Sequence, residues 1–155
     1  MPSAASPSAE PVRIEEQLCF ALYAASRAVT ALYRPVLQGL GLTYPQYLVM
    51  LVLWDRGALT VKELASGLQL DYGTLSPLLK RLEANGLVCR ERRSDDERSV
   101  RVALTQAGAS LGPRAHAVPR VLSEASGLDE AALGAIRDTL HRLTDLVSAA
   151  RPPER

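Results

Sequence analysis

Cys19 is the residue of this sequence whose chemistry most needs an explanation. It lies in the segment EEQLCFALYAASR, beside Leu18 and Leu22 on an expected apolar helix face. There it is either a small apolar packing residue or a redox-active thiol, and the thiolate is the form that reacts with oxidants. Its neighbours disfavour that form, since Glu15 and Glu16 lie within one helical turn and no Lys or Arg lies within four residues.

Tyrosine hydroxyls could supply the stabilisation that a thiolate at Cys19 lacks, because hydrogen bonds to an anion favour it. Tyr23 follows Cys19 by four residues, which places both side chains on one helix face. Tyr33 follows Cys19 by fourteen residues, which is about 21 Å along a straight helix. If Tyr33 contacts a cysteine, that cysteine therefore belongs to a second chain whose first helix crosses this one in an antiparallel arrangement.

Length and composition describe one ordinary globular domain. The 155 residues are 47% hydrophobic and 23% charged with a formal net charge of +1, so binding to nucleic acid must depend on local charge. Two cysteines, Cys19 and Cys89, do not make a disulfide framework and indicate a reducing, cytoplasmic setting. The longest apolar run, YLVMLVLW, is too short to span a bilayer, so we expect no membrane association. His116 and His141 lack partners at metal-ligand spacing, so we expect neither a metal nor a cofactor.

The elements that must position these residues are mostly helices. We expect a disordered tail over residues 1–12, followed by helices over 14–32, 45–57, 59–70 and 71–86. Strands follow in LVCRERR and SVRVAL. A helix then starts from TQAGASL, which Pro113 and Pro119 bend or interrupt, and the last helix covers 129–149. Pro35 and the following glycines are expected to end the first helix. Thr60 with Glu63 forms a capping box, and Asp71 is an N-cap.

Two short helices followed by a hairpin predict a winged helix-turn-helix. The fold class is therefore mainly α with a small β-hairpin wing, flanked by N- and C-terminal dimerisation helices. We assign residues 13–150 to a single winged-helix domain, with DNA-binding residues 45–104 and dimerisation helices over 13–42 and 105–150. The terminal helices carry narrow apolar seams, Leu18, Leu22, Ala25, Val29 and Leu32 in one and Leu133, Ile136, Leu140, Leu143 and Val147 in the other. Such seams interlock in a symmetric homodimer or, alternatively, pack on each other within one chain.

The fourth helix and the hairpin carry the candidate contacts to double-stranded operator DNA. Small polar groups near a helix start suit base edges, and long cations suit phosphates and the minor groove. The candidate DNA-binding residues are Asp71, Tyr72, Gly73, Thr74, Ser76, Lys80, Arg81, Arg93, Asp96 and Arg98. A solvated hairpin face is the alternative for the arginines. Pro77, beyond the first turn, either loosens a turn that meets DNA or kinks the helix for structural reasons.

The sequence resembles a known family over residues 18–108. The stretches LCFALYAASRAVTALYRPVLQGLGLTYPQYLVMLVLW, LTVKELASGLQLDYGTLSPLLKRLEANGLVCRERRSDDERSV and LTQAG are similar to the multiple-antibiotic-resistance-type (MarR) repressors. Within them, LCFALYAASR together with LTYPQY resembles the organic hydroperoxide resistance regulators (the OhrR branch). The resemblance implies a dimeric repressor that releases its operator when an organic hydroperoxide oxidises the cysteine matching Cys19. It also implies that tyrosines matching Tyr33 and Tyr44 hydrogen-bond that cysteine, with Tyr23 close by.

The same resemblance has implications for the wing, and the sequence departs from the family pattern in two respects. Asp96 and Arg98 match a wing pair that contacts the minor groove. Tyr72 stands where relatives commonly carry a small hydroxyl residue, which affects the expected base contact. Two-cysteine relatives carry a second cysteine near the C-terminal helices, whereas Cys89 falls in the first wing strand. The chain is therefore similar to the one-cysteine type.

Oxidation at Cys19 is expected to give a sulfenic acid and then a mixed disulfide with a low-molecular-weight thiol. An apolar lining from Phe20, Leu22, Val36 and Leu42 favours alkyl hydroperoxides over hydrogen peroxide. One alternative is a regulator released by a reversibly bound phenolic molecule, with Cys19 as packing. Another is a cysteine-dependent peroxidase, but without a resolving cysteine or a basic partner we expect no enzyme.

Overall fold

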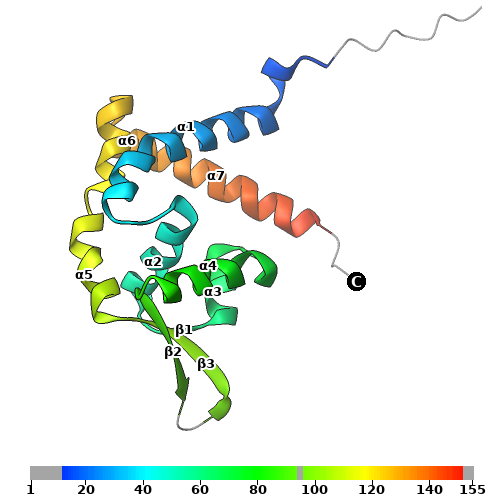
Figure 1. The fold of residues 1–155 in the computed structure, drawn as a ribbon. Coiled ribbons are helices and arrows are strands. Elements are labelled where there is room, and N and C mark those ends of the chain that lie inside the picture. Colours follow the sequence, from blue (N-terminus) through cyan, green and yellow to red (C-terminus); the bar gives the residue numbers. More distant parts are fainter. Residues whose placement is uncertain (1–11, 94–95, 152–155) are drawn as a thin grey trace, which may run out of the picture.

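The computed structural model describes residues 12–93 and 96–151, and the side chains of residues 93–99 lie outside that description. Nearly all of the expected tail is therefore outside the described residues. The elements in chain order are η1 (Ile14–Glu16), α1 (Leu18–Gly39), α2 (Tyr44–Arg56), β1 (Leu59–Thr60), α3 (Val61–Leu68), α4 (Tyr72–Ala84), β2 (Val88–Arg93), β3 (Asp96–Leu104), α5 (Gln106–Ala115), α6 (Val118–Ser126) and α7 (Glu130–Ala150) (Figure 1). This is the predicted winged helix-turn-helix with flanking helices.

The core forms around α2, as its nearly continuous apolar sequence predicts. Thr43 and Gln46 start this helix with a capping box, in which each side chain accepts a hydrogen bond from the other residue's backbone N–H. Val49, Met50 and Leu53 are buried beneath the leucines of α3 and α4. The helix-turn-helix is therefore held by a core that a single chain completes.

The wing is larger than the sequence predicts, because Leu59 and Thr60 form a strand rather than the start of a helix. β1 pairs with β3, which also pairs with β2, giving an antiparallel sheet in the order β1-β3-β2. A two-residue strand has no periodicity to read, so only its pairing with distant Val102 and Arg101 reveals it. Thr60 still caps α3 as predicted, accepting a hydrogen bond from the Glu63 amide.

The first helix differs from its prediction at both ends. It begins at Leu18, after a separate 3-10 turn, and it runs through Pro35 to Gly39. Proline in a helix interior costs about 3 kcal/mol, but Pro35 is exposed, so water can reach the carbonyl oxygen it leaves without a partner. Burial of Leu37 and Leu40 just beyond it offsets the cost.

The expected interruption of the fifth helix is confirmed and occurs between Ala115 and Val118, just before Pro119. Pro113 is accommodated inside α5, whereas Pro119 lies in the first turn of α6, where its missing N–H would have no helical partner. α6 packs against α1. The bend between α5 and α6 thus brings the C-terminal part of the chain back to the first helix.

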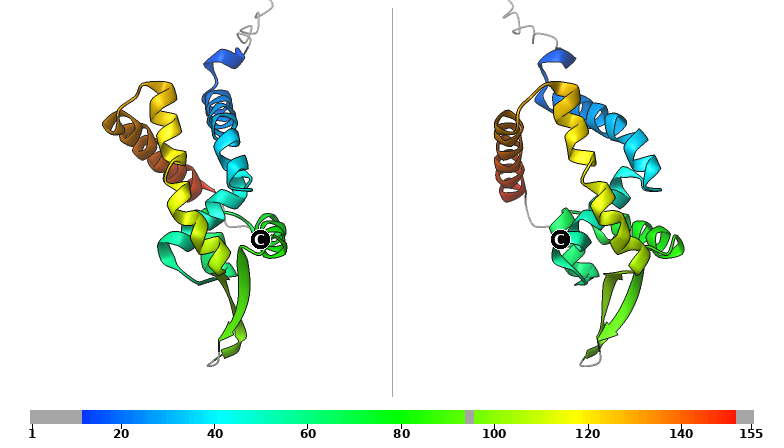
Figure 2. Two further views of the ribbon diagram at one scale, coloured as in Figure 1. Left: turned by 60° about the vertical axis from the view of Figure 1, so that its left-hand side comes forward. Right: turned by 90° about the vertical axis from the view of Figure 1, so that its left-hand side faces the viewer.

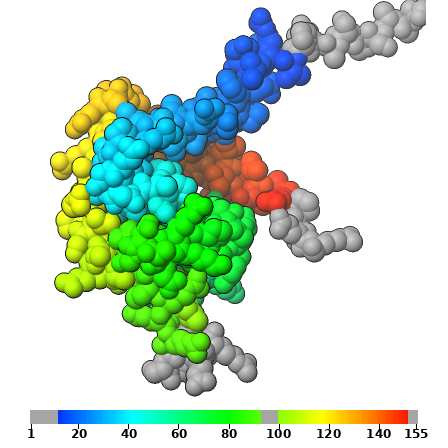
Figure 3. Space-filling model, in the orientation of Figure 1, coloured from blue at the N-terminus to red at the C-terminus, as the bar shows by residue number. Residues whose placement is uncertain are grey.

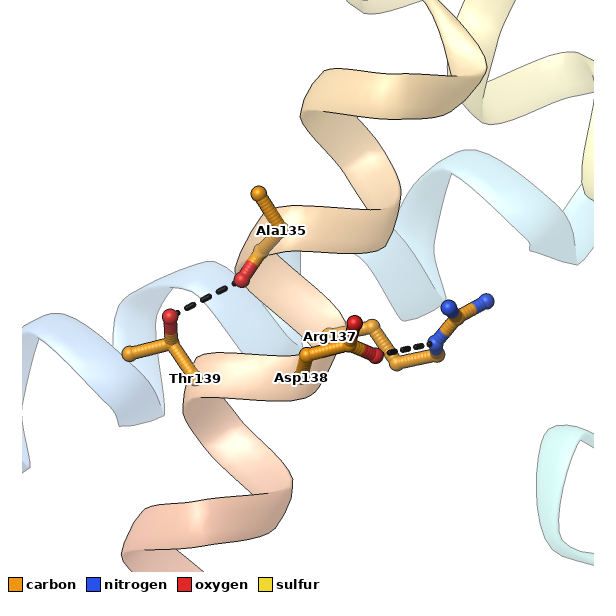
Figure 4. A network of polar contacts seen from close by, with 4 residues as sticks. All are labelled: Ala135, Arg137, Asp138 and Thr139. Carbon is orange, nitrogen blue, oxygen red and sulfur yellow. Dashed lines mark hydrogen bonds and ion pairs between the residues drawn. The ribbon is translucent and has the colours of Figure 1, made fainter.

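α7 stands away from the core in the turned views of Figure 2, and Figure 3 shows its C-terminal part emerging from behind α1. None of its residues is buried, and Ile136 and Val147 of its predicted seam are 50% and 62% exposed. The polar contacts in Figure 4 lie within this helix: Thr139 donates to the Ala135 carbonyl oxygen over 2.8 Å, and Arg137 donates to Asp138 over 3.1 Å. In the single chain, the apolar seam of α7 has therefore no core to join.

Among the described residues, no single helix is long and apolar enough to cross a membrane. α1 and α2 taken together meet the criteria of length and composition for a membrane span, with a bend of 71° between them. The buried face of α2 is already occupied by the core.

Candidate functional site

Cys19 occupies the first turn of α1 and its thiol is free and exposed. Gln17 is the N-cap but provides no side-chain hydrogen bond to the helix start. The amides of this turn therefore leave a positive helix end that favours a nearby anion. Glu15 and Glu16 lie in η1 rather than in the same helix, so the helical spacing that made them oppose a thiolate is absent.

Tyr23 is held by Arg27 rather than by Cys19. The Arg27 guanidinium donates a hydrogen bond of 3.5 Å to the phenol oxygen, and its central carbon lies 5.5 Å from the ring centroid. Within the described part of one chain, no hydrogen bond joins any tyrosine to the Cys19 thiol. The helical spacing of Tyr23 and Cys19 is as predicted, and their side chains share no hydrogen bond in the single chain.

Tyr33 and Tyr44 are brought together, with ring centroids 6.0 Å apart. Tyr33 comes from the last third of α1 and Tyr44 from the start of α2, so the turn between the two helices forms the pair. Burial, with a smaller contribution from the nearby Tyr44, raises the pKa of Tyr33 above its usual 10.0. The Tyr33 hydroxyl therefore keeps its proton at neutral pH and can donate it in a hydrogen bond.

Two aromatic residues that the sequence reasoning missed extend this pair into the core. Tyr47 lies 6.2 Å from Tyr44, and Trp54 lies 6.4 Å from Tyr47, between ring centroids. The Trp54 Nε1 donates a hydrogen bond of 3.0 Å to the Gly108 carbonyl oxygen on α5. Spacings of three residues (Tyr44 to Tyr47) and seven (Tyr47 to Trp54) on one helix are a sequence signal for a shared face.

The two parts of the expected redox site lie at opposite ends of α1. Because this helix is unbroken from Leu18 to Gly39, Cys19 and Tyr33 are separated by about 21 Å along its axis. The sequence-based premise is confirmed: Tyr33 cannot reach the cysteine of its own chain.

The start of α4 forms an exposed surface. Asp71 accepts hydrogen bonds from the Thr74 amide (2.7 Å) and the Thr74 hydroxyl (2.9 Å), which lowers the pKa of Asp71. Both side chains therefore define the helix start, and the Thr74 oxygen keeps its acceptor lone pairs for a ligand. Tyr72 is 62% exposed beside them.

The remaining α4 candidates are exposed, with one partial exception. Gly73, Lys80 and Arg81 are exposed, whereas Ser76 is half-buried. The opposite face is closed by the buried Leu75, Leu79 and Leu82. Pro77 does not interrupt α4, and the helix continues to Ala84.

Arg93, Asp96 and Arg98 lie at the outer end of the wing, but their side chains are outside the described residues. Arg93 pairs with Asp96, whereas the next register pair is Arg92 with Val100, so Arg98 falls in an irregular part of β3. The wing projects away from α1 and α7 (Figures 1 and 2). The role of Arg93, Asp96 and Arg98 in DNA binding remains a prediction.

Other basic residues of this region are held within the chain. Arg90 forms an ion pair with Glu83 at 3.4 Å, and Arg101 donates a hydrogen bond to the Ala58 carbonyl oxygen. These contacts make both arginines less available for DNA. Cys89 is half-buried in β2, opposite Ala103.

The comparisons with known proteins agree with this geometry. The family described as transcriptional regulator SarA/Rot matches residues 31–112. The organic hydroperoxide resistance transcriptional regulator of Bacillus subtilis is 47% identical, over 84% of this chain and 94% of the relative. Reduced AbfR bound to DNA, a protein from Staphylococcus epidermidis, superposes with a TM-score of 0.73 at 34% identity, covering 89% of this chain and 94% of that one. A mutant MarR of Escherichia coli complexed with operator DNA gives a TM-score of 0.73 at 25% identity, covering 81% and 92%.

The wing and the exposed start of α4 define a winged-helix, DNA-binding transcriptional regulator. The chain belongs to the MarR/SarA-type family of these regulators, in its organic hydroperoxide resistance branch.

Proposed function

We propose that this regulator is a repressor that releases operator DNA when an organic hydroperoxide oxidises Cys19. The observation that carries the proposal is the placement of the exposed Cys19 at one end of an unbroken α1 and of the Tyr33–Tyr44 pair at the other. A homodimer in which the two α1 helices cross antiparallel would bring each cysteine to the tyrosine pair of the partner chain. Tyrosine hydroxyls that keep their protons would then stabilise the thiolate.

The exposed apolar seams support the dimer. Leu18 on α1 and Ile136, Leu140 and Val147 on α7 are exposed in the single chain. Apolar side chains in such a continuous stripe normally contact another surface. A second copy supplies the same stripe in a symmetric, self-complementary interface.

The proposed chemistry is a two-electron oxidation of sulfur. The Cys19 thiolate attacks the outer oxygen of the hydroperoxide, so an S–O bond forms, the O–O bond breaks, and the departing alkoxide takes up a proton to become an alcohol. A low-molecular-weight thiol then attacks the sulfur of the sulfenic acid, so an S–S bond forms and the S–O bond breaks. The hydroxide takes up the proton of the thiol and leaves as water, and the product is a mixed disulfide. Phe20 and Leu22 remain near the surface, where their apolar side chains favour the alkyl group of a hydroperoxide. Leu42 is buried in the core and does not line the site.

Release of DNA follows from the spacing that the two α4 helices of a dimer require. A dimer must place its two α4 helices in successive major grooves about 34 Å apart. A bulky adduct at the crossing of the α1 helices would change that spacing. DNA binding would thus depend on a two-state arrangement that a covalent event biases.

An operator gel shift with cumene hydroperoxide tests the proposal. Wild type and Cys89→Ser should both lose the complex, and Cys19→Ser should keep it. Loss of DNA by Cys19→Ser to the same extent as wild type would show that Cys19 is not the sensor. Release of Cys19→Ser by a phenolic molecule, reversed by dialysis, would favour the ligand-binding alternative, and sustained peroxide turnover with excess thiol would favour the peroxidase.

Mixed dimers test whether the site crosses the two chains. A heterodimer of Cys19→Ser with Tyr33→Phe retains one complete site if Cys19 pairs with the partner's Tyr33, and none if the pairing is within a chain. We therefore expect one thiol of the mixed dimer to react with peroxide at the wild-type rate. Reaction at the slower rate of the Tyr33→Phe homodimer would contradict the crossed arrangement.

A further inference from the structure

Trp54 joins the tyrosine cluster to the base of the wing. Its ring packs beside Tyr47, which continues through Tyr44 to Tyr33, and its Nε1 donates to the Gly108 carbonyl oxygen. The ring contacts are spaced at 6.0 to 6.4 Å between centroids, the range of aromatic pairs in contact. The side chains thus form one uninterrupted line from the proposed redox site to the start of α5.

Two glycines on one face of α5 allow its neighbours to approach closely. A Cβ on Gly112 would lie 3.4 Å from the Trp54 indole, so the ring already rests against the helix backbone. A Cβ on Gly108, one turn earlier on the same face, would lie 2.0 Å from the Leu87 carbonyl oxygen, so the helix backbone lies even closer to that residue. The N-terminal half of α5 therefore packs closely against both Trp54 and Leu87.

Leu87 lies between the two elements that meet DNA. It follows the end of α4 and precedes β2, the first strand of the wing. The Thr105 amide donates 3.1 Å to the Leu87 carbonyl oxygen, and the Thr105 hydroxyl donates to that of Gly86. A displacement of the α5 start therefore acts on the connection between α4 and the wing, because close-packed interiors transmit strain.

We propose that Trp54 is the positioning residue through which the tyrosine pair sets the orientation of α4 and the wing. This role rests on the proposed oxidation of Cys19. When the contacts of Tyr33 and Tyr44 change, the aromatic rings shift together, and the hydrogen bond from Trp54 carries the shift to Gly108. Trp54 touches neither the oxidant nor DNA, and its effect is on the coupling between them.

The emission of Trp54 tests this role directly, because it is the only tryptophan in the sequence. We expect cumene hydroperoxide to change the emission of wild type with the same time course as operator release, and to leave that of Cys19→Ser unchanged. Release of the operator with unchanged emission would overturn the role of Trp54. If the thiol and the operator complex both survive peroxide, the proposed oxidative response is itself wrong, and the role of Trp54 falls with it.

The variant Trp54→Phe keeps an aromatic ring beside Tyr47 and removes the hydrogen bond to Gly108. We expect the reduced variant to bind the operator as wild type does and its Cys19 to be oxidised normally, with the oxidised form losing at least about fivefold less affinity than oxidised wild type. Arg114→Gln is the matched control, since Arg114 also donates from α5 to a backbone carbonyl oxygen, that of Gly39 at 2.9 Å, outside the aromatic line.

Arg114→Gln should release DNA like wild type. An equal defect in operator release in both variants would mean that any loosening of α5 is sufficient to impair release. Full release by oxidised Trp54→Phe would mean that no coupling passes through the indole. Either result contradicts the proposal. If Trp54→Phe fails to fold, the emission of wild type decides the question.

Discussion

The DNA-reading half of the chain and its terminal helices bury their apolar side chains to very different extents. Val49, Leu64, Leu75 and Leu82 in the first are completely buried, whereas α7 has no buried residue. Leucines at helical spacing occur in both regions, so the spacing alone does not distinguish them. The difference teaches that one region completes its core within the chain, while the other leaves apolar side chains exposed.

Removing a core leucine should have the largest effect on the single chain. Leu75→Ala leaves a cavity between α4 and α2, and we expect the free energy of unfolding to fall by about 2–5 kcal/mol. Urea unfolding followed by circular dichroism measures this. The loss should be the same at every protein concentration, and a loss that depends on concentration would place Leu75 in an interface rather than in a core.

The close approach of α5 to the wing base gives the next largest effect. Gly108→Ala directs a methyl group at the Leu87 carbonyl oxygen, and such overpacking costs about 1–3 kcal/mol. The matched substitution Gly112→Ala meets the Trp54 ring at an ordinary contact distance and should be neutral or slightly stabilising. Thermal melts of the two variants compare the positions, and equal melting temperatures would show that the approach is not as tight as described.

A charge on the α7 seam should leave the stability of the single chain almost unchanged. Ile136 is half exposed, so Ile136→Glu should alter the unfolding of the monomer by less than about 0.5 kcal/mol. The same variant should elute as a monomer and bind the operator weakly, because a like charge would enter the interface on both chains. Light scattering measures the mass, and a dimeric Ile136→Glu protein would place the interface elsewhere.

The smallest effect concerns alkaline pH. Burial, followed by the nearby Tyr33 and Tyr44, raises the pKa of Tyr47 above 10.0. The unfolded chain therefore ionises first, so stability is complete below about pH 10 and declines as the pH rises through the folded-state pKa. Tyr47→Phe should show a shallower decline of the melting temperature between about pH 9 and pH 11. Tyr72→Phe, which removes an exposed tyrosine, is the control and should decline as wild type does.

Sequence patterns were sufficient where the structure depends on neighbours along the chain. The caps at Thr60 and Asp71 were predicted because a capping side chain bonds an amide three residues away. β1 was missed because two residues carry no pattern, and its existence depends on pairing with β3. The extension of α1 past Pro35 was missed because burial of Leu37, not helix propensity, decides it.

The candidate site divides in the same way. The separation of Cys19 from Tyr33 could be calculated from helical rise alone, and the structure confirms it. The contact of Tyr33 with Tyr44 depends on how α1 turns into α2, whereas the continuation to Tyr47 and Trp54 runs along α2, where its spacing could have been read. The pairing of Arg90 with Glu83 likewise could not be read from the sequence, because those residues belong to different elements.

The sequence by itself determined the order of the longer helices and of the two hairpin strands, the exposed face of α4, and the requirement that Tyr33 and Cys19 of one chain remain apart. These follow from local hydrogen bonding and from the fixed rise of a helix. Only the tertiary structure decided which apolar stripes become core and which stay exposed, and that Trp54 reaches Gly108. Such contacts depend on the packing of distant segments, which no local pattern encodes.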